Sequence, residues 1–204
     1  MWASRARARF LAQDRPELSQ FGIVQGGTNV PLRIESVERT LAVGFDGYAI
    51  GGLSVGESRS AMLDTLAEVL PLLPPDQPRY LMGLGDPIGI VESVALGIDL
   101  FDCVLPTRFA RHGTILSSQG RYNLKRSENI AADAPLDAAC GCPVCARWSR
   151  AYLRHLLTVD EPTAPRLLTL HNVWWTLALV DEVRTAVEAG SLDGVRSRIA
   201  AAYG

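Results

Sequence analysis

The stretch "RYLMGLGDPIGIVESVALGIDLFDCVLPTR", residues 79–108, decides the fold because it holds a complete strand–helix–strand unit. Two short apolar runs, 79–85 and 100–106, flank a segment of helical periodicity. Each run is apolar on both faces, as a strand covered on both sides would be. Asp86-Pro87 gives the helix a cap and a first-turn proline. We therefore predict strand, helix and strand in that order.

The same alternation occurs earlier in the chain. The runs "FGIVQGG" (21–27) and "GYAIGGL" (47–53) are two further predicted strands. A helix is predicted from Pro31 to about Val43, and another begins near Ser58. The order β-α-β-α-β-α-β, with right-handed crossovers, predicts an α/β fold with a parallel sheet.

Four such strands make a poor unit by themselves, because the two outer strands would be unpaired edges with apolar faces. The beginning, "WASRARARFLA" (2–12), already reads as helix interior without a cap. Both features favour the second half of a larger barrel, with a partial (β/α) barrel over 1–106 and a second region over 107–204.

The composition is that of an ordinary soluble globular protein. The chain has 204 residues, 48% hydrophobic and 21% charged, with a net charge of −2. No apolar run approaches the roughly 18 residues that span a membrane, and the N-terminus lacks the apolar core of a signal peptide. We therefore expect a cytoplasmic protein without membrane contact.

The second region departs from the βα alternation. Residues 106–140 read as loops and short strands. Helical periodicity follows over 144–158, over 166–188 with a break expected inside it, and over 191–203.

Three cysteines in the second region have metal-binding spacing. Cys140, Cys142 and Cys145 form C-x-C-x2-C, and three close thiolates suit one tetrahedral zinc ion. The candidates for the fourth ligand are Cys103, His112, His155 and His171. His171 is preferred because its helix, after the turn "DEPTAP", can run back towards the cysteines. The alternative is three free cysteines or a disulfide.

A basic bias marks residues 103–127, which contain no acid. Arg108 and Arg111 directly follow the predicted strand that carries Asp102, and a phosphate backbone is a natural partner for such a stretch. An ordinary solvated surface is the alternative interpretation.

The carboxyl ends of the predicted strands gather polar groups and glycines, at the edge where α/β barrels hold their active sites. Gln25 offers donors and an acceptor, Gly52 and Leu53 lie at the end of the second predicted strand, and Met82 offers an apolar surface. Together with Asp102 they predict a pocket for a planar, hydrogen-bonding heterocycle beside a carboxylate.

At these motifs the chain resembles the tRNA-guanine transglycosylases, or queuine tRNA-ribosyltransferases. The resemblance rests on "FGIVQGG", "GFDGYAIGGLSVGE", "YLMGLG", "GIDLFDCVLPTR" and "CGCPVCARWSRAYLRHL…HN" and covers nearly the whole chain. It implies the C-terminal half of a TIM-like (β/α)8 barrel with an attached zinc-binding subdomain. It also implies exchange of guanine at the tRNA wobble position for a 7-deazaguanine, a step of queuosine biosynthesis.

The resemblance assigns roles to single positions. Asp102 matches the nucleophile, which would form a covalent ribosyl-aspartate intermediate. The base-binding positions are Gln25, Gly52, Leu53 and Met82. The tRNA-binding positions are Gly83, Gly85, Pro87, Thr107, Arg108 and Arg111. The ligands of a structural Zn²⁺ are Cys140, Cys142, Cys145 and His171. Val55 matches the bacterial pattern, which favours preQ1 as the incoming base.

The departures from the family pattern limit these expectations. The family's chains are nearly twice as long, and their N-terminal half supplies four strands, an acid/base Asp and a base-binding Asp. Gly89 stands where the family usually has an acid. We therefore expect 1–204 to be inactive alone, with a second copy or a complementing N-terminal half as partner. The alternatives are a non-catalytic tRNA-binding subunit and a remnant zinc module.

Overall fold

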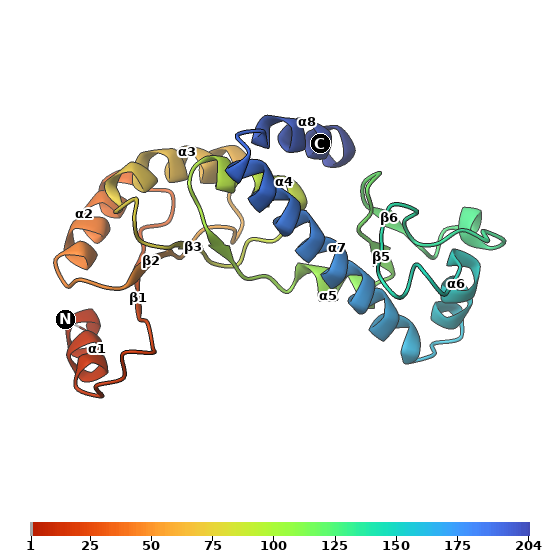
Figure 1. The fold of residues 1–204 in the computed structure, drawn as a ribbon, viewed down its shortest axis with the longest axis horizontal. Helices are drawn as coiled ribbons and strands as arrows, with labels where there is room; N and C mark the ends of the chain where they lie inside the picture. The colour runs from red at the N-terminus through yellow and green to blue at the C-terminus, as the bar shows by residue number, and fades with distance from the viewer. Residues whose placement is uncertain (1) are drawn as a thin grey trace. The chain divides into compact units, whose positions relative to one another are not determined.

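A computed structural model of the chain describes residues 2–204, and its elements are labelled in Figure 1. The first elements are α1 (Trp2–Leu11), β1 (Phe21–Val24), α2 (Val30–Leu41), β2 (Gly47–Ile50), α3 (Arg59–Val69), the 3-10 turn η1 (Leu70–Leu72), β3 (Arg79–Leu81), α4 (Pro87–Ala95) and β4 (Leu100–Phe101). The four strands are parallel, in the order β1-β2-β3-β4. This confirms the predicted α/β fold with a parallel sheet.

The remaining elements are α5 (Leu105–Arg111), β5 (Thr114–Ile115), β6 (Tyr122–Asn123), the 3-10 turn η2 (Ser127–Asn129), α6 (Arg150–Thr158), α7 (Thr163–Glu188) and α8 (Leu192–Tyr203). The contacts divide the chain into two compact units. The first holds the residues up to Leu84 and 92–103, and the second holds 85–91 and 104–204.

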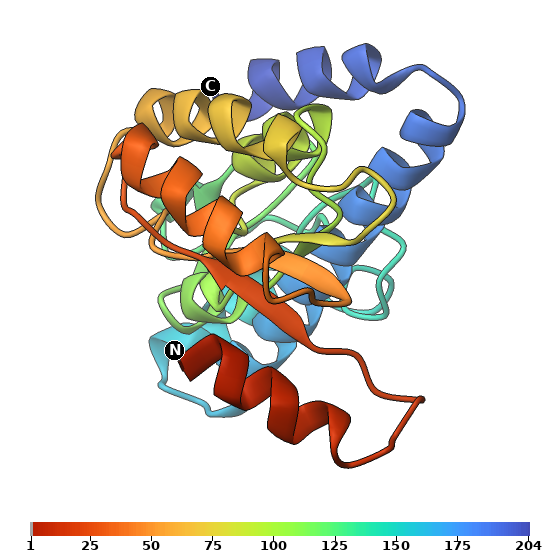
Figure 2. The same ribbon diagram turned by 90° about the vertical axis from the view of Figure 1, so that its left-hand side faces the viewer.

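In the first unit, local sequence explains where the helices begin. The side chain of Asn29 accepts a hydrogen bond from the Leu32 backbone N–H at the start of α2. Ser58 does the same for Ala61 at the start of α3. The two helices pack beside each other along the sheet (Figure 2). Their inward side chains join the strands in one apolar core that includes Val37, Ile50 and Leu66.

One face of this sheet is less covered than predicted. Ile23 in β1 is 47% exposed and Leu100 in β4 is 45% exposed, so the expectation of strands buried on both faces is wrong for these two strands. An apolar hollow of about 380 Å³ at the sheet is lined by Phe21, Ile23, Ala49, Tyr80, Met82, Leu100 and Phe101. The described strands form an open sheet, and closure into a barrel stays a prediction.

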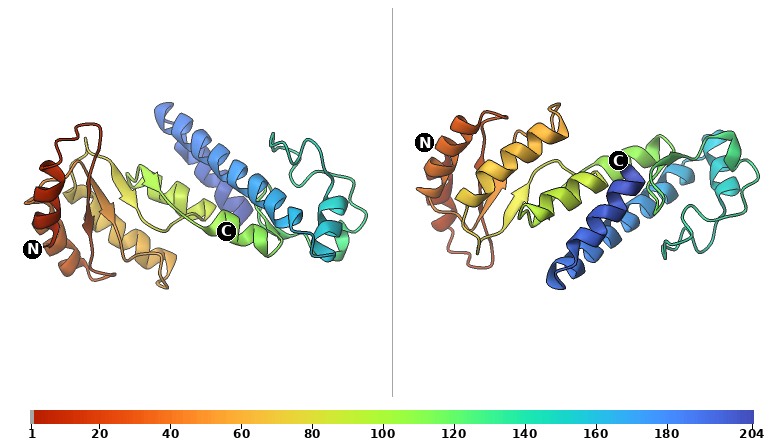
Figure 3. Two further views of the ribbon diagram at one scale, coloured as in Figure 1. Left: turned by 90° about the horizontal axis from the view of Figure 1, so that it is seen from below. Right: turned by 90° about the horizontal axis from the view of Figure 1, so that it is seen from above.

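The second unit has its own apolar core, built around Leu124, Leu136, Leu153 and Leu168. Helix α8 folds back against α7 (Figure 3). Among residues 2–204, no helix is both long and apolar enough to cross a membrane.

Three predicted elements of the second unit need correction. Residues 105–111 form the helix α5 rather than a loop, because Pro106 lies in the first helical turn, where its missing N–H costs nothing. The helix predicted from residue 144 begins only at Arg150, after the cap Ser149. The expected break in the next helix is absent, since α7 runs without interruption over 26 residues.

Candidate functional site

Asp102 lies directly after β4 and is exposed, so it does not bear the cost of a buried charge. Two donors hold its carboxylate, one in the neighbouring strand β3 and one in the loop after it. The Tyr80 hydroxyl donates to Oδ1 over 2.6 Å, and the Gly83 backbone N–H donates to the same oxygen over 2.9 Å. Since both bonds fall on Oδ1, one oxygen is anchored while Oδ2 takes neither bond.

These contacts set the ionisation of the pair. The hydrogen bond from Tyr80, with a smaller contribution from the Gly83 N–H, holds the pKa of Asp102 below its ordinary value. The same bond to Asp102 raises the pKa of Tyr80. Near neutral pH the pair therefore consists of a carboxylate and a neutral phenol, which is the state that a carboxylate nucleophile requires.

Tyr80 is a site residue that none of the sequence motifs indicates. The register supplies a signal for it, because Tyr80 pairs with Leu100 and both lie two residues before Met82 and Asp102. Residues two apart on a strand share a face, so a tyrosine at this position lies on the face of the predicted site residues. Asp99 has a structural role, since its carboxylate accepts a hydrogen bond from the Arg79 backbone N–H over 2.8 Å.

The predicted base-binding residues of β1 and β2 lie against each other. The Gln25 amide covers the backbone of Gly51 and Gly52. A Cβ on Gly51 would come within 2.6 Å of Gln25 Nε2, and one on Gly52 within 2.6 Å of Oε1. Gly52 also has φ +65°, a conformation that favours glycine. The two glycines are therefore needed to seat the amide of Gln25.

Leu53 and Met82 differ in what they present. Leu53 as a whole residue is 2% exposed and its side chain belongs to the core, so only its backbone, itself largely covered, could contribute to recognition. The Met82 side chain is partly exposed and lines the apolar hollow of the sheet together with Tyr80. A planar ligand thus finds amide groups at the ends of β1 and β2 and an apolar wall from β3.

The metal-ligating residues of the second unit converge as predicted. Nδ1 of His171 lies 3.7, 3.4 and 3.3 Å from the Sγ atoms of Cys140, Cys142 and Cys145. Tetrahedral zinc with Zn–S near 2.3 Å and Zn–N near 2.0 Å separates such ligand atoms by roughly 3.6 Å. His155 and Cys103 are not in this group. The four residues form a closed, structural zinc site.

The surroundings of the zinc site fix its imidazole ligand. Nε2 of His171 donates to the Leu116 carbonyl over 2.9 Å, which leaves Nδ1 to bind metal. Burial lowers the pKa of His171, so its ring stays neutral. Burial also raises the pKa of Cys140 to about 11 and that of Cys145 to about 12, so zinc must displace thiol protons on binding.

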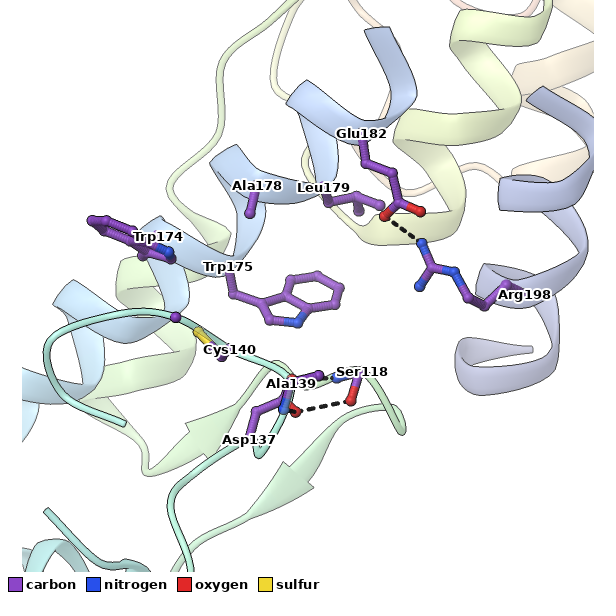
Figure 4. A pocket seen from close by; sticks show the side chains of 11 residues that line it. Ser118, Asp137, Ala139, Cys140, Trp174, Trp175, Ala178, Leu179, Glu182 and Arg198 are labelled. Carbon is purple, nitrogen blue, oxygen red and sulfur yellow. Dashed lines mark hydrogen bonds and ion pairs between the residues drawn. The ribbon is translucent and has the colours of Figure 1, made fainter. Parts of the chain in front are cut away.

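Neighbouring polar groups brace the same site. The Asp137 carboxylate accepts from the backbone N–H groups of Ser118 and Ala139 and from the Ser118 hydroxyl, which fixes the turn before Cys140. A hollow of about 190 Å³ adjoins this turn, with the Trp175 indole turned into it (Figure 4).

Asn172 follows the histidine ligand and is fully buried. It accepts from the Leu116 N–H and donates to the carbonyls of Pro106 and Thr114, so α7 holds both α5 and β5.

The predicted tRNA-binding residues differ in exposure. Gly83, Arg108 and Arg111 are exposed, whereas Gly85 and Pro87 are buried. Thr107 bonds the Val104 carbonyl within α5. The guanidinium of Arg121 stacks on the ring of Phe109, which belongs to α5, at 5.3 Å from the ring centre. Arg108 and Arg111 are therefore accessible to an anionic partner, whereas the buried members of the predicted tRNA-binding residues are not.

Comparison with known proteins decides the family. The family model of queuine tRNA-ribosyltransferase matches residues 1–204. The chain belongs to the queuine tRNA-ribosyltransferase family. It is 50% identical to a queuine tRNA-ribosyltransferase of Solidesulfovibrio magneticus over 202 residues, which is 99% of this chain and 54% of the relative. It is 47% identical to one of Halothermothrix orenii over 191 residues, 94% of this chain and 50% of that relative.

The chain thus spans about half the length of the curated relatives it matches. The family membership supports the predicted chemistry of tRNA modification and the zinc site.

Proposed function

We propose that this chain carries the nucleophile and the base-reading loops of a tRNA-guanine transglycosylase. The observation that carries the proposal is the carboxylate of Asp102, exposed at a strand end and anchored through one oxygen by Tyr80 and Gly83. Such an arrangement orients a nucleophile and keeps it ionised. On this proposal residues 1–106 are the second half of a TIM-like barrel, and 107–204 are the zinc subdomain and C-terminal helices.

The reaction is a double displacement at a sugar carbon. Oδ2 of Asp102 attacks C1′ of the wobble guanosine, the C1′–N9 bond breaks, and guanine leaves with the bonding electrons and takes up a proton. In the second step N9 of the incoming base, having lost its proton, attacks C1′ and releases the Asp102 carboxylate. A carboxylate suits both steps because the transition states have oxocarbenium character.

The proposed base-reading groups are those of the first unit to which the family resemblance assigns this role. The Gln25 amide and the backbone of Gly52 and Leu53 offer hydrogen bonds to the edge of the base, and Met82 packs on its ring. Val55 is exposed. Its match to the bacterial pattern of the family favours preQ1 as the incoming base. The target nucleotide has to leave its stack to reach these groups.

The tRNA backbone would be held by Gly83, Gly85, Pro87, Thr107, Arg108 and Arg111. The two arginines carry most of this role because they are exposed and always charged. Buried Gly85, in the loop between β3 and α4, and buried Pro87, the first residue of α4, support it only by shaping the backbone. A tRNA substrate places the reaction in the cytoplasm, and Zn²⁺ at Cys140, Cys142, Cys145 and His171 stabilises the second unit without entering the chemistry.

The acid/base group for guanine and for the incoming base is expected outside the matched half, so 1–204 alone should not exchange guanine. The test is incorporation of labelled guanine into tRNA. We expect none with this chain alone, and incorporation when the unmatched segment of the Solidesulfovibrio magneticus relative is added. Asp102→Asn should abolish it, whereas Asp99→Asn, which changes an acid three residues away, should not.

Two outcomes separate the alternatives. Exchange by the chain alone would contradict the need for a complementing half. Binding of tRNA in a gel shift without any exchange in the complemented mixture would favour a non-catalytic partner subunit. Absence of tRNA binding would leave only a zinc-stabilised module.

A further inference from the structure

Arg33 is a buried charge that the proposed chemistry does not use. It lies on α2, its side chain is 0% exposed, and burial lowers the pKa of its guanidinium. Burying a charge is costly unless it is compensated by strong contacts. The nearest opposite charge that acts on it is Glu57, and no ion pair joins the two among residues 2–204. An aliphatic side chain would fill this space at lower cost, so the guanidinium calls for a specific explanation.

Its hydrogen bonds supply that explanation. Nε donates to the Gly27 carbonyl over 2.8 Å, Nη1 to the Val24 carbonyl over 3.0 Å, and Nη2 to the Gly52 carbonyl over 3.3 Å. These carbonyls belong to the end of β1, to the loop after it and to the loop after β2. One planar group thus joins the two segments that contain Gln25 and Gly52.

The bond to Gly52 also orients a donor. In a trans peptide the C=O and the following N–H point in opposite directions. Because the Gly52 carbonyl is turned towards buried Arg33, the Leu53 N–H points away from it. That N–H has no acceptor within residues 2–204. The arrangement explains how Leu53 can contribute to recognition although its side chain is in the core.

We propose that Arg33 is a positioning residue for base recognition. It fixes the spacing between the Gln25 amide and the Gly52–Leu53 peptide, and it thereby sets which purine-like base these groups accept. The inference rests on the proposed function, since it takes the ligand to be a 7-deazaguanine. A lysine cannot replace Arg33, because an ammonium lacks the planar fork that reaches three carbonyls at once.

The test is a titration of the 204-residue chain with preQ1, followed by NMR. In the unsubstituted protein we expect shifts of the Gln25 side-chain amide, of the Leu53 backbone amide and of the Arg33 Nε–H. Arg33→Lys should weaken preQ1 binding by about tenfold or more, since bonds to a charged donor are lost. Arg39→Lys is the matched control, because Arg39 lies on the same helix in an exposed pair with Glu35. This variant should bind preQ1 with unchanged affinity.

The outcomes are distinct. Unchanged preQ1 affinity in a folded Arg33→Lys variant would overturn the inference and leave the proposed function standing. If the variant does not fold, the NMR signal of the Arg33 Nε–H in the unsubstituted protein provides the test. A signal that shifts on addition of preQ1 supports the inference, and a signal that does not shift refutes it. Failure of the proposed function would appear separately, as absence of guanine exchange in the complemented mixture.

Discussion

Replacing Tyr80 with phenylalanine tests the anchoring of the nucleophile in the chain as it stands. The change removes one hydroxyl and with it the 2.6 Å bond to Asp102 Oδ1, while the bond from the Gly83 N–H remains. A hydrogen bond to a charged group contributes about 1.5–3 kcal/mol in a buried setting. Because Asp102 is exposed, solvent reduces this contribution to about 1 kcal/mol.

The sign of the pH dependence follows from the direction of the shift. The pKa of Asp102 is lowered in the folded state, so the stabilisation is present above its ordinary value of 3.8 and is lost as the pH falls through the folded pKa. Tyr80→Phe should therefore lower the free energy of unfolding by about 1 kcal/mol near neutral pH. The difference from the unsubstituted protein should shrink in acid.

Carbon-13 NMR of the Asp102 carboxyl measures the shift directly, and denaturant unfolding at several pH values measures its contribution to stability. The pKa of Asp102 should rise in Tyr80→Phe. It should not change in Tyr152→Phe, where the ring is 46% exposed and lies in the second unit. An Asp102 that titrates identically in all three proteins would refute the reasoning.

Three further predictions concern the metal, the core and the basic surface. Cys145→Ser should abolish binding of one zinc per chain, measured by metal analysis, whereas Cys103→Ser should retain it. Leu66→Ala removes a fully buried side chain and should lower the free energy of unfolding by about 2–5 kcal/mol in denaturant titrations. Combined Arg108→Glu and Arg111→Glu should weaken tRNA binding at least about tenfold in gel shifts and flatten its salt dependence.

Two controls accompany them. Leu72→Ala, at a side chain 43% exposed, should change stability by no more than about 0.5 kcal/mol. Arg184→Glu reverses an exposed arginine on α7 and should leave tRNA binding nearly unchanged. An equal loss of stability in Leu66→Ala and Leu72→Ala would show that burial does not determine the effect. An equal loss of tRNA binding in the two arginine variants would show that the position of the charge does not matter.

The strand and helix order of the first unit could be predicted because each element is marked locally. Apolar runs mark the strands, and Asn29 and Ser58 cap helices where polar residues precede apolar periodicity. The exposure of Ile23 and Leu100 could not be predicted in this way, because it depends on what covers the sheet rather than on the strand itself.

The cysteine part of the zinc site could be predicted from the C-x-C-x2-C spacing. The fourth ligand could only be narrowed to a preference for His171 among four candidates, because it depends on how α7 packs against the cysteines. The late start of α6 could not be predicted, since the turns around the metal ligands override helical periodicity between Val144 and Trp148. The α5 helix was missed for a related reason. Pro106 suggests a turn, yet in the first turn of a helix it is favourable.

The residues of the candidate site likewise differ in whether the sequence alone could predict them. Asp102 and Gln25 could be predicted from their positions at strand ends. The partners Tyr80 and Arg33 could not, because their roles depend on the register between strands and on burial, which no local pattern reveals.

The most direct test of the central claim is to trap the covalent intermediate. The chain is mixed with tRNA and the unmatched segment of the Solidesulfovibrio magneticus relative, denatured, and examined for RNA-linked protein by gel electrophoresis and peptide mass spectrometry. We predict an adduct on the peptide that contains Asp102, absent from Asp102→Asn and present in Asp99→Asn. An adduct on another residue, or one that persists in Asp102→Asn, would contradict the assignment of Asp102 as the nucleophile.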